Sequence, residues 1–251
     1  MCVHTSLTKS AKAIEKKTNK QFITPKLFTP YFHFNGWESK NLAITTQEAP
    51  KYIELAKWGV LPTDYDINYR THFLAKTNTL NATRERLFES DLYSKFIEGQ
   101  RCIIYSDGFF EPHAAAGVAK KIPYFFKEKN HDLFAFAGIY SKVKQDQKTG
   151  YAASIITTEA NDYFKAIHNK PNALGSYRMP LILDPKHYEA WLQTNTTEEV
   201  KELLNGFTQQ ELVSYPVSTD VFSTKKDSNV PNILNKVPFA QQLNFGDGLF
   251  S

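Results

Sequence analysis

Hydrophobic positions along the chain fall into two patterns: short apolar runs bounded by turn-forming residues, and longer stretches with helical spacing or helix-forming composition. The short runs predict strands within residues 42–62, 101–105, 123–127, 133–140, 152–157, 179–183 and 212–217. Helices are predicted at residues 5–20, 82–99, 159–167, 188–192 and 197–204. Because strands and helices do not alternate regularly, the pattern predicts a single α+β domain.

Three segments lack such patterns and are expected to be irregular. Residues 21–37 are interrupted by Pro25 and Pro30, which favours loop and edge-strand structure. Residues 169–177 form a polar connection, and residues 223–251 show little periodicity. We therefore expect one domain over residues 1–222, with residues 223–251 as a C-terminal tail that packs on this domain or trails from it.

The composition is that of an ordinary globular protein, with 41% hydrophobic and 22% charged residues among 251. A net charge of +4 permits a nucleic-acid partner without requiring one. Cys2 and Cys102 are too few for a disulfide framework, and neither lies in a metal-binding motif. The sequence contains no apolar run of 18 residues and no signal-peptide pattern. We expect a cytoplasmic protein, taken as a monomer, without metal, cofactor or membrane association.

The dipeptide Met1-Cys2 is the first feature with chemical potential. Methionine aminopeptidase removes Met1 when the second residue is small, and the product carries an α-amine beside a thiol. The amine of such a 1,2-aminothiol adds to an aldehyde to form an imine, and the thiol then closes a five-membered thiazolidine. An α-amine pKa of roughly 7.7–8.0 leaves a reactive neutral fraction at physiological pH. Taken alone, the dipeptide favours the simpler explanation that Cys2 is an incidental second residue.

Three downstream residues could support this chemistry, and each also has an ordinary structural explanation. Glu111 follows an apolar strand and could act as a general acid or base, or it could be a surface residue at a strand end. His168 follows a predicted helix and could shuttle protons or serve a structural role. Asn81 precedes a predicted helix and fits its N-cap position.

Cationic and aromatic residues near these positions could form a groove for a single nucleic-acid strand, in which bases stack on rings and phosphates meet cations. Trp37 is one of these aromatic residues, and Arg101 is one of these cationic residues. The residues expected to contact DNA are Arg84, Arg86, Arg178, Trp58, Phe109 and Phe110. The Lys-rich segment 9–20 is instead expected to be a solvated helical face.

A series of short motifs runs along the chain from residue 1 to about 220: Met1-Cys2, Trp58–Pro62, Asn81-Ala82, Arg101–Ile104, Asp107–Glu111, Phe136–Tyr140, Thr157–Asn161, Ile167-His168, Arg178–Leu183 and Tyr215–Ser218. Each motif is short, but in order and spacing the series resembles the SOS response-associated peptidase (SRAP) family. Members of that family shield abasic sites in DNA by cross-linking to them.

The resemblance implies a fold and a set of roles. The fold is a single α+β domain with a curved, barrel-like, mostly antiparallel β core, peripheral helices and a positively charged groove for single-stranded DNA and strand junctions. Cys2 would supply the amine and thiol of a cross-link to an abasic site. Asn81 would hold the N-terminal residue and the opened sugar, Glu111 would assist proton transfers, and His168 would act as an acid or base on the sugar hydroxyl or imine. Arg178 would contact a DNA phosphate.

The sequence departs from the family pattern in the residues expected to contact DNA, while the four residues expected to carry the chemistry are present. We therefore expect the cross-linking chemistry of the family to be kept and the DNA-binding surface to be altered. The departures are Val3-His4 in place of Gly-Arg, Thr83 in place of an Arg, Pro112 in place of a Trp, and the segment 169–177 where one residue usually separates His168 from Arg178.

Three activities remain open from the sequence. The first, implied by the resemblance, is a lyase-like cross-linking of DNA at abasic sites during the response to DNA damage, accompanied by removal of Met1. The second is a cysteine-type peptidase, which needs a base near Cys2 and an oxyanion hole. The third is non-covalent binding of single-stranded DNA, which needs the groove but not Cys2. The combination of Cys2 with Asn81, Glu111 and His168 favours the first.

Overall fold

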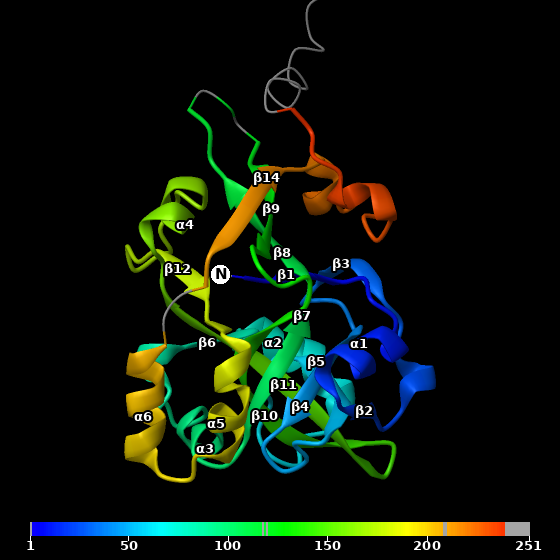
Figure 1. Ribbon diagram of the computed structural model, residues 1–251, viewed down its shortest axis with the longest axis vertical. Helices are drawn as coiled ribbons and strands as arrows, with labels where there is room; N and C mark the ends of the chain where they lie inside the picture. The colour runs from blue at the N-terminus through cyan, green and yellow to red at the C-terminus, as the bar shows by residue number, and fades with distance from the viewer. Residues whose placement is uncertain (1, 117, 119, 208–209, 239–251) are drawn as a thin grey trace, which may run out of the picture.

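A closed barrel of five strands lies at the centre of the computed structural model, which describes residues 2–116, 118, 120–207 and 210–238 (Figure 1). Around the barrel the strands are β11 (Lys148–Glu159), β10 (Phe134–Gln145), β7 (Arg101–Ser106), β4 (Asn41–Thr46) and β5 (Tyr52–Trp58). These neighbours pair in antiparallel fashion. A parallel pairing of β5 with β11, in which Ala56 faces Tyr151, closes the ring.

Four short strands extend the barrel at its edges. Two of them, β6 (Asn81–Thr83) and β12 (Arg178–Pro180), pair with β11, and β13 (Ile182–Leu183) pairs with β10. The fourth, β2 (Gln21–Phe22), runs parallel to β5. Because β6 and β12 share β11, two segments far apart in the sequence meet at one edge of the barrel.

A second sheet packs at one end of the barrel, with the order β14 (Leu212–Pro216), β9 (Ile122–Glu128), β8 (Gly108–His113), β1 (His4–Leu7) and β3 (Tyr31–Asn35). The chain passes from the barrel into this sheet at Asp107, between β7 and β8. The Asp107 carboxylate accepts hydrogen bonds from Ser6 Oγ at 2.7 Å and from the Thr8 backbone at 2.6 Å. This acid therefore fastens the N-terminal strand beside the junction of the two sheets.

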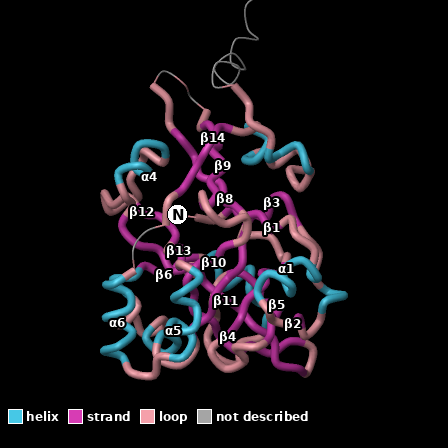
Figure 2. The backbone as a smooth tube through the Cα atoms, viewed as in Figure 1, coloured by secondary structure: helices cyan, strands magenta, loops and turns pink. Residues whose placement is uncertain are grey.

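Helices cover the outside of both sheets, as the tube view shows (Figure 2). The α-helices are α1 (Ala11–Thr18), α2 (Arg70–Lys76), α3 (Ser94–Ile97), α4 (Asp162–Ile167), α5 (Tyr188–Gln193) and α6 (Thr197–Gly206). The single turns of 3-10 helix are η1 (Pro25–Leu27), η2 (Ile67–Tyr69), η3 (Arg84–Arg86), η4 (Pro185–His187), η5 (Thr219–Phe222) and η6 (Pro231–Leu234). With these elements the predicted α+β fold with a barrel-like core is confirmed.

Two predicted helices are corrected. Residues 5–7 belong to strand β1 and only Ala11–Thr18 is helical, since Thr5 pairs with Phe34 and Phe109 on neighbouring strands. The predicted helix after Asn81 breaks into β6, η3 and the four-residue α3. Asn81 is therefore not an N-cap, because it pairs with Ile155 of β11 as part of a strand. In both places tertiary strand pairing outweighs local helix propensity.

Aromatic side chains fill the interface between the barrel and the second sheet. Phe109 stacks on Phe126 with ring centroids 5.2 Å apart, and Phe164 of α4 packs on Phe126 at 4.9 Å. A separate apolar cluster forms on the other face of the second sheet around Phe110, and Ile233 in η6 is buried in it. Residues 223–238 thus pack against the sheet, whereas 239–251 lie outside the described residues.

No helix in the described part of the chain is long and apolar enough to cross a membrane.

Candidate active site

The four residues predicted to carry chemistry come together where the N-terminal segment passes between the two sheets (Figure 1). Asn81 Nδ2 donates a hydrogen bond of 2.9 Å to the main-chain carbonyl of Cys2. The Glu111 carboxylate lies near enough to the Cys2 thiol for its charge to raise the pKa of that thiol. His168 Nδ1 lies 3.5 Å from Glu111 Oε2. The residues come from the N-terminal segment, β6, β8 and the end of α4, so no local sequence pattern could bring them together.

Cys2 is enclosed by protein, with 1% of its surface exposed. Burial raises the pKa of the Cys2 thiol well above its ordinary value, and the neighbouring Glu111 charge raises this pKa further. The Cys2 Sγ atom lies 4.0 Å from the His4 carbonyl oxygen, which it approaches as a weak donor. At neutral pH the side chain is therefore a protonated thiol and not a thiolate.

Asn81 is held rigidly beside Cys2. Its backbone lies in β6, and its carbonyl accepts a hydrogen bond of 3.2 Å from the Tyr93 hydroxyl. The side-chain oxygen Oδ1 is buried and has no hydrogen-bond partner among the described residues. A buried amide oxygen without a partner carries a desolvation cost, and it is ready to accept a hydrogen bond from an incoming donor.

Glu111 is 1% exposed on β8, where it faces Tyr124 of β9. Its Oε1 atom is also buried and lacks a hydrogen-bond partner in the described structure. Two unpaired acceptors therefore belong to side chains around Cys2: Asn81 Oδ1, on the amide that binds its carbonyl, and Glu111 Oε1, on the carboxyl whose charge acts on its thiol. Such a pair of acceptors suits a donor-rich group such as an amine.

His168 forms the C-cap of α4, a short helix whose N-cap is Asn161. Its Nδ1 atom lies 3.1 Å from the Pro112 carbonyl oxygen. Because a carbonyl can only accept, Nδ1 carries the hydrogen of this bond, and the neutral ring has its lone pair on Nε2. A histidine held in this way presents one defined nitrogen for proton transfer.

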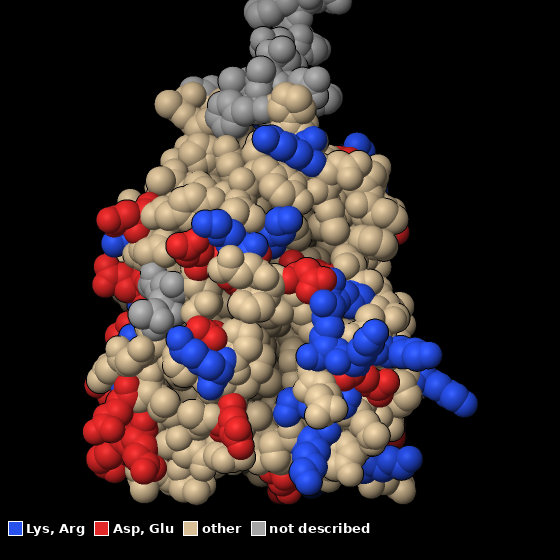
Figure 3. Space-filling model, viewed as in Figure 1, with Lys and Arg blue, Asp and Glu red and all other residues tan. Residues whose placement is uncertain are grey.

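A cleft of about 1400 Å³ opens above these residues, and Glu111 and His168 form part of its wall. Trp37, whose surface is 46% exposed, also lines the cleft. Figure 3 shows small groups of Lys and Arg side chains over the upper part of this face and a larger group over α1 at the right, whereas Asp and Glu gather over α6 at the lower left. The basic residues that line the cleft are Lys120, Lys121, Lys170, Arg178, Lys225 and Lys226.

The predicted aromatic contacts with DNA are corrected. The side chains of Trp58, Phe109 and Phe110 are fully buried, so they cannot stack on bases in this conformation. Trp58 Nε1 donates to the Leu80 carbonyl at 2.8 Å, which explains its place in the core. Trp37 has the exposure and position that these three lack, and the sequence placed it in the same aromatic group.

The predicted arginines divide into two groups. Arg178 lines the cleft, where its guanidinium forms an ion pair with Glu85, with N–O distances of 2.8 and 3.0 Å. Arg84 is hydrogen-bonded to Asn205, and both Arg84 and Arg86 lie outside the cleft lining. The sequence missed the cleft lysines because they come from three separate loops, although the adjacent Lys225 and Lys226 could have drawn attention.

The family model for SRAP, "SOS response associated peptidase (SRAP)", matches residues 1–224 of the chain. The chain belongs to the SRAP family. It is 32% identical over 202 residues to the abasic site processing protein YoaM of Bacillus subtilis, which covers 78% of this chain and 82% of that protein. It is 30% identical over 222 residues to YoqW of the same organism, an abasic site processing protein, covering 86% and 91% of the two chains.

A solved structure supports this placement. The chain is similar to a Bacteroides thetaiotaomicron protein solved by X-ray crystallography, with a TM-score of 0.80 and 27% identity over 94% of this chain and 100% of that chain. A second neighbour, from Bordetella bronchiseptica, has a TM-score of 0.69 at 20% identity and supports the fold alone. In the described part of this SRAP chain, no group of three or more His, Cys, Asp and Glu side chains is arranged to hold a metal ion.

Proposed function

We propose that this SRAP protein forms a covalent cross-link to abasic sites in single-stranded DNA through Cys2, after Met1 is removed. The observation that carries the proposal is the surroundings of Cys2, where Asn81 Nδ2 binds its carbonyl and the charge of Glu111 acts on its thiol. The relatives' description as abasic site processing proteins supports the choice of substrate. While Met1 is present, the Cys2 nitrogen is part of a peptide bond. Removal of Met1 frees this nitrogen as an amine and so makes Cys2 reactive.

The reaction joins an aminothiol to an aldehyde. The Cys2 amine adds to C1′ of the open-chain abasic sugar, and the former carbonyl oxygen takes up a proton. This oxygen then leaves as water, which gives the imine. The Cys2 sulfur adds to C1′ and its proton passes to the imine nitrogen, closing the thiazolidine. One water is released and no oxidant or reductant is needed.

The side chains around Cys2 suit the proton movements of this sequence. Asn81 Oδ1 and Glu111 Oε1 are the unpaired acceptors that could hold the hydrogens of the amine and keep its lone pair directed outward. Glu111, whose charge acts on the thiol, is placed to take the proton from sulfur. His168, in the cleft wall, presents the lone pair of Nε2, which can take a proton from the attacking amine and return it to the departing oxygen.

The raised pKa of Cys2 bears on the alternative of a general cysteine peptidase. Such enzymes attack with a thiolate, which requires a cysteine whose pKa is lowered by a cationic neighbour. Burial and Glu111 shift the Cys2 pKa in the opposite direction. An amine that attacks first and a thiol that adds afterwards with proton transfer fit this environment better.

The test is to mix the mature protein with single-stranded DNA that carries one abasic site and to separate the products under denaturing conditions. We expect a slow-migrating adduct that is absent for Cys2→Ala, for Cys2→Ser and for protein that retains Met1. Cys102→Ala is the matched control, because it removes the other cysteine, which is buried in β7.

Other outcomes would overturn the proposal. Binding of the DNA without any adduct would identify a non-covalent binder. An adduct that persists in Cys2→Ala would place the nucleophile elsewhere. Cysteine-dependent cleavage of peptides, measured with an unrelated peptide library and without DNA, would support the peptidase instead.

A further inference from the structure

We propose that His4 and His33 form a neutral imidazole pair that directs one ring nitrogen of His4 to an uncharged oxygen of the abasic sugar, next to Cys2. This inference rests on the proposed cross-linking function, since the sugar is its ligand. It assigns a substrate-binding role to His4 and positioning roles to His33 and to Ser228 of the C-terminal segment.

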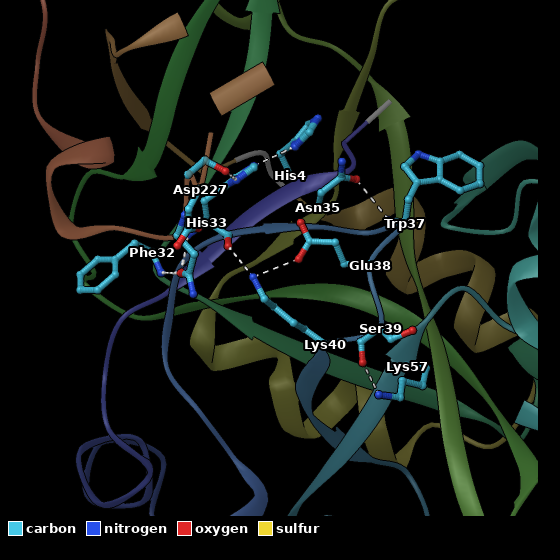
Figure 4. A network of polar contacts seen from close by, with 12 residues as sticks. His4, Phe32, His33, Asn35, Trp37, Glu38, Ser39, Lys40, Lys57 and Asp227 are labelled. Carbon is cyan, nitrogen blue, oxygen red and sulfur yellow. Dashed lines mark hydrogen bonds and ion pairs between the residues drawn. The ribbon is translucent and has the colours of Figure 1, made fainter. Parts of the chain in front are cut away.

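A hydrogen-bonded path runs from His4 through His33 to Ser228, and Figure 4 labels the two histidines of this path. His4 Nδ1 lies 2.9 Å from His33 Nε2, and His33 Nδ1 lies 2.6 Å from Ser228 Oγ. The two rings are stacked, with centroids 5.1 Å apart and planes 17° from parallel. A hydrogen bond between two imidazole nitrogens needs one donor and one acceptor, so the pair cannot be protonated on both facing nitrogens.

The path ends at the candidate active site. His4 lines the cleft together with Glu111, and the Cys2 Sγ atom lies 4.0 Å from the His4 carbonyl. Because His4 Nδ1 is engaged by His33, the other nitrogen, Nε2, is the one left to bind substrate. When Ser228 donates to His33 and His33 donates to His4, Nε2 carries a hydrogen. In the reversed direction Nε2 is an acceptor, so the path can pass a proton to or from the sugar.

The C-terminal segment holds His33 in place. Asn229 Oδ1 accepts hydrogen bonds from the backbone nitrogens of Phe32 at 2.8 Å and His33 at 3.3 Å. Together with the Ser228 contact, these bonds fasten β3 to a segment that lies beyond the 1–224 match to the family model. The same segment is anchored in the apolar cluster by Ile233. Lys225, Lys226 and Val237 of this segment line the cleft, so residues beyond the match to the family model complete its wall.

Burial keeps both rings neutral, while the charges around the pair act in both directions. Burial lowers the pKa of His4 to about 4 and the neighbouring His33 lowers it as well, while Glu111 acts in the opposite direction. Burial and Lys40 lower the pKa of His33 to about 4, against the effect of Asp227. A neutral imidazole cannot neutralise a phosphate, but it pairs well with a hydroxyl or carbonyl oxygen.

The test compares His4→Ala, His4→Gln and wild type in two assays. The first measures adduct formation at saturating abasic DNA, and the second measures binding to a tetrahydrofuran abasic analogue, which has no aldehyde, at several salt concentrations. We expect His4→Ala to slow adduct formation by about tenfold, because one neutral hydrogen bond to the sugar is lost. The slope of log affinity against log salt should stay unchanged. His4→Gln, which keeps a neutral polar group, should restore most of the rate.

Positioning by His33 and Ser228 has its own readout. His33→Ala removes a group that lowers the His4 pKa, so the pH profile of adduct formation should shift toward higher pH. Ser228→Ala should slow adduct formation, and Ser228→Thr, which keeps the hydroxyl, should rescue it. Thermal melting of each variant at pH 7 shows whether the fold is retained. An unchanged pH profile in folded His33→Ala would overturn the positioning role.

Two results would overturn the role of His4. A salt slope reduced by about 0.7 in His4→Ala would identify His4 as a phosphate contact on single-stranded DNA. An unchanged adduct rate in His4→Ala, alongside a normal wild-type adduct, would remove His4 from the site while leaving the cross-linking function intact. Absence of the adduct in wild type would instead overturn the cross-linking function itself.

Discussion

Asn81 reaches from β6 at the edge of the barrel to the main-chain carbonyl of Cys2, which it binds at 2.9 Å through Nδ2. This contact joins the barrel to the segment that leads into the second sheet. The other end of the amide, Oδ1, is buried and unpaired in the described structure. The Asn81 side chain therefore binds the Cys2 carbonyl through Nδ2, and its Oδ1 atom is left to accept a hydrogen bond from the Cys2 amine.

Replacing Asn81 should slow the chemistry and spare DNA binding. In Asn81→Ala the Cys2 backbone loses its anchor, and we expect adduct formation at saturating DNA to slow by about tenfold to a hundredfold through loss of orientation. Asn81→Asp should be no faster, because it places an acceptor against a carbonyl oxygen. Asn68→Ala, at an exposed position in η2, is the control. A wild-type rate in Asn81→Ala would contradict the assignment.

Glu111→Gln keeps the shape of the side chain and removes its proton-transfer capacity. We expect adduct formation to slow by about a hundredfold or more, with affinity for the tetrahydrofuran analogue within about threefold of wild type. Rates at saturating DNA and binding isotherms give the two quantities separately. Glu202→Gln, exposed on α6, is the matched control. Equal losses of rate and affinity would sink the catalytic assignment of Glu111.

The cleft lysines should account for part of the salt dependence of DNA binding. We expect Lys170→Gln and Lys225→Gln each to reduce the slope of log affinity against log salt by about 0.7 on single-stranded DNA, with about fivefold weaker binding at 0.1 M salt. Lys12→Gln tests a lysine of α1 that is outside the cleft lining. Identical slopes for the cleft and α1 variants would show that DNA binds elsewhere.

The buried histidine pair should make the protein less stable in mild acid. The pKa values of His4 and His33 are about 4 in the folded protein, below the ordinary 6.5 of an unfolded chain. Their contribution to stability is complete above pH 6.5 and is lost as the pH falls toward 4, since only the unfolded chain takes up protons in this range. The loss is up to about 3 kcal/mol for buried His33 and less for partly exposed His4.

Urea unfolding at pH 7, 5.5 and 4.5 measures this loss. As the pH is lowered, the free energy of unfolding should fall more steeply for wild type than for the double variant His4→Gln/His33→Gln. The variant has no imidazoles to protonate at these positions. His72→Gln, an exposed position in α2, controls for the removal of a histidine as such. Parallel pH curves for wild type and the double variant would refute the neutral pair.

Much of the architecture followed from the amino-acid sequence. The apolar runs predicted the positions of the barrel strands β4, β5, β7, β10 and β11. A strand can be predicted in this way because a few consecutive apolar and β-branched residues are enough to favour it. The order of short motifs identified the family, and with it the four residues that meet at the N-terminus. These features depend on residues close together in the chain or on their order along it.

The tertiary structure alone decided which surfaces these residues face. Asn81 looked like a helix N-cap, yet pairing with Ile155 of β11 made it extended and turned its amide to Cys2. Trp58 looked like a stacking platform and became core, since burial depends on what packs above a strand. The pairing of His4 with His33 and the lysine-lined cleft likewise join distant segments. Such contacts form only when the whole chain folds, and the local pattern of hydrophobic residues carries no information about them.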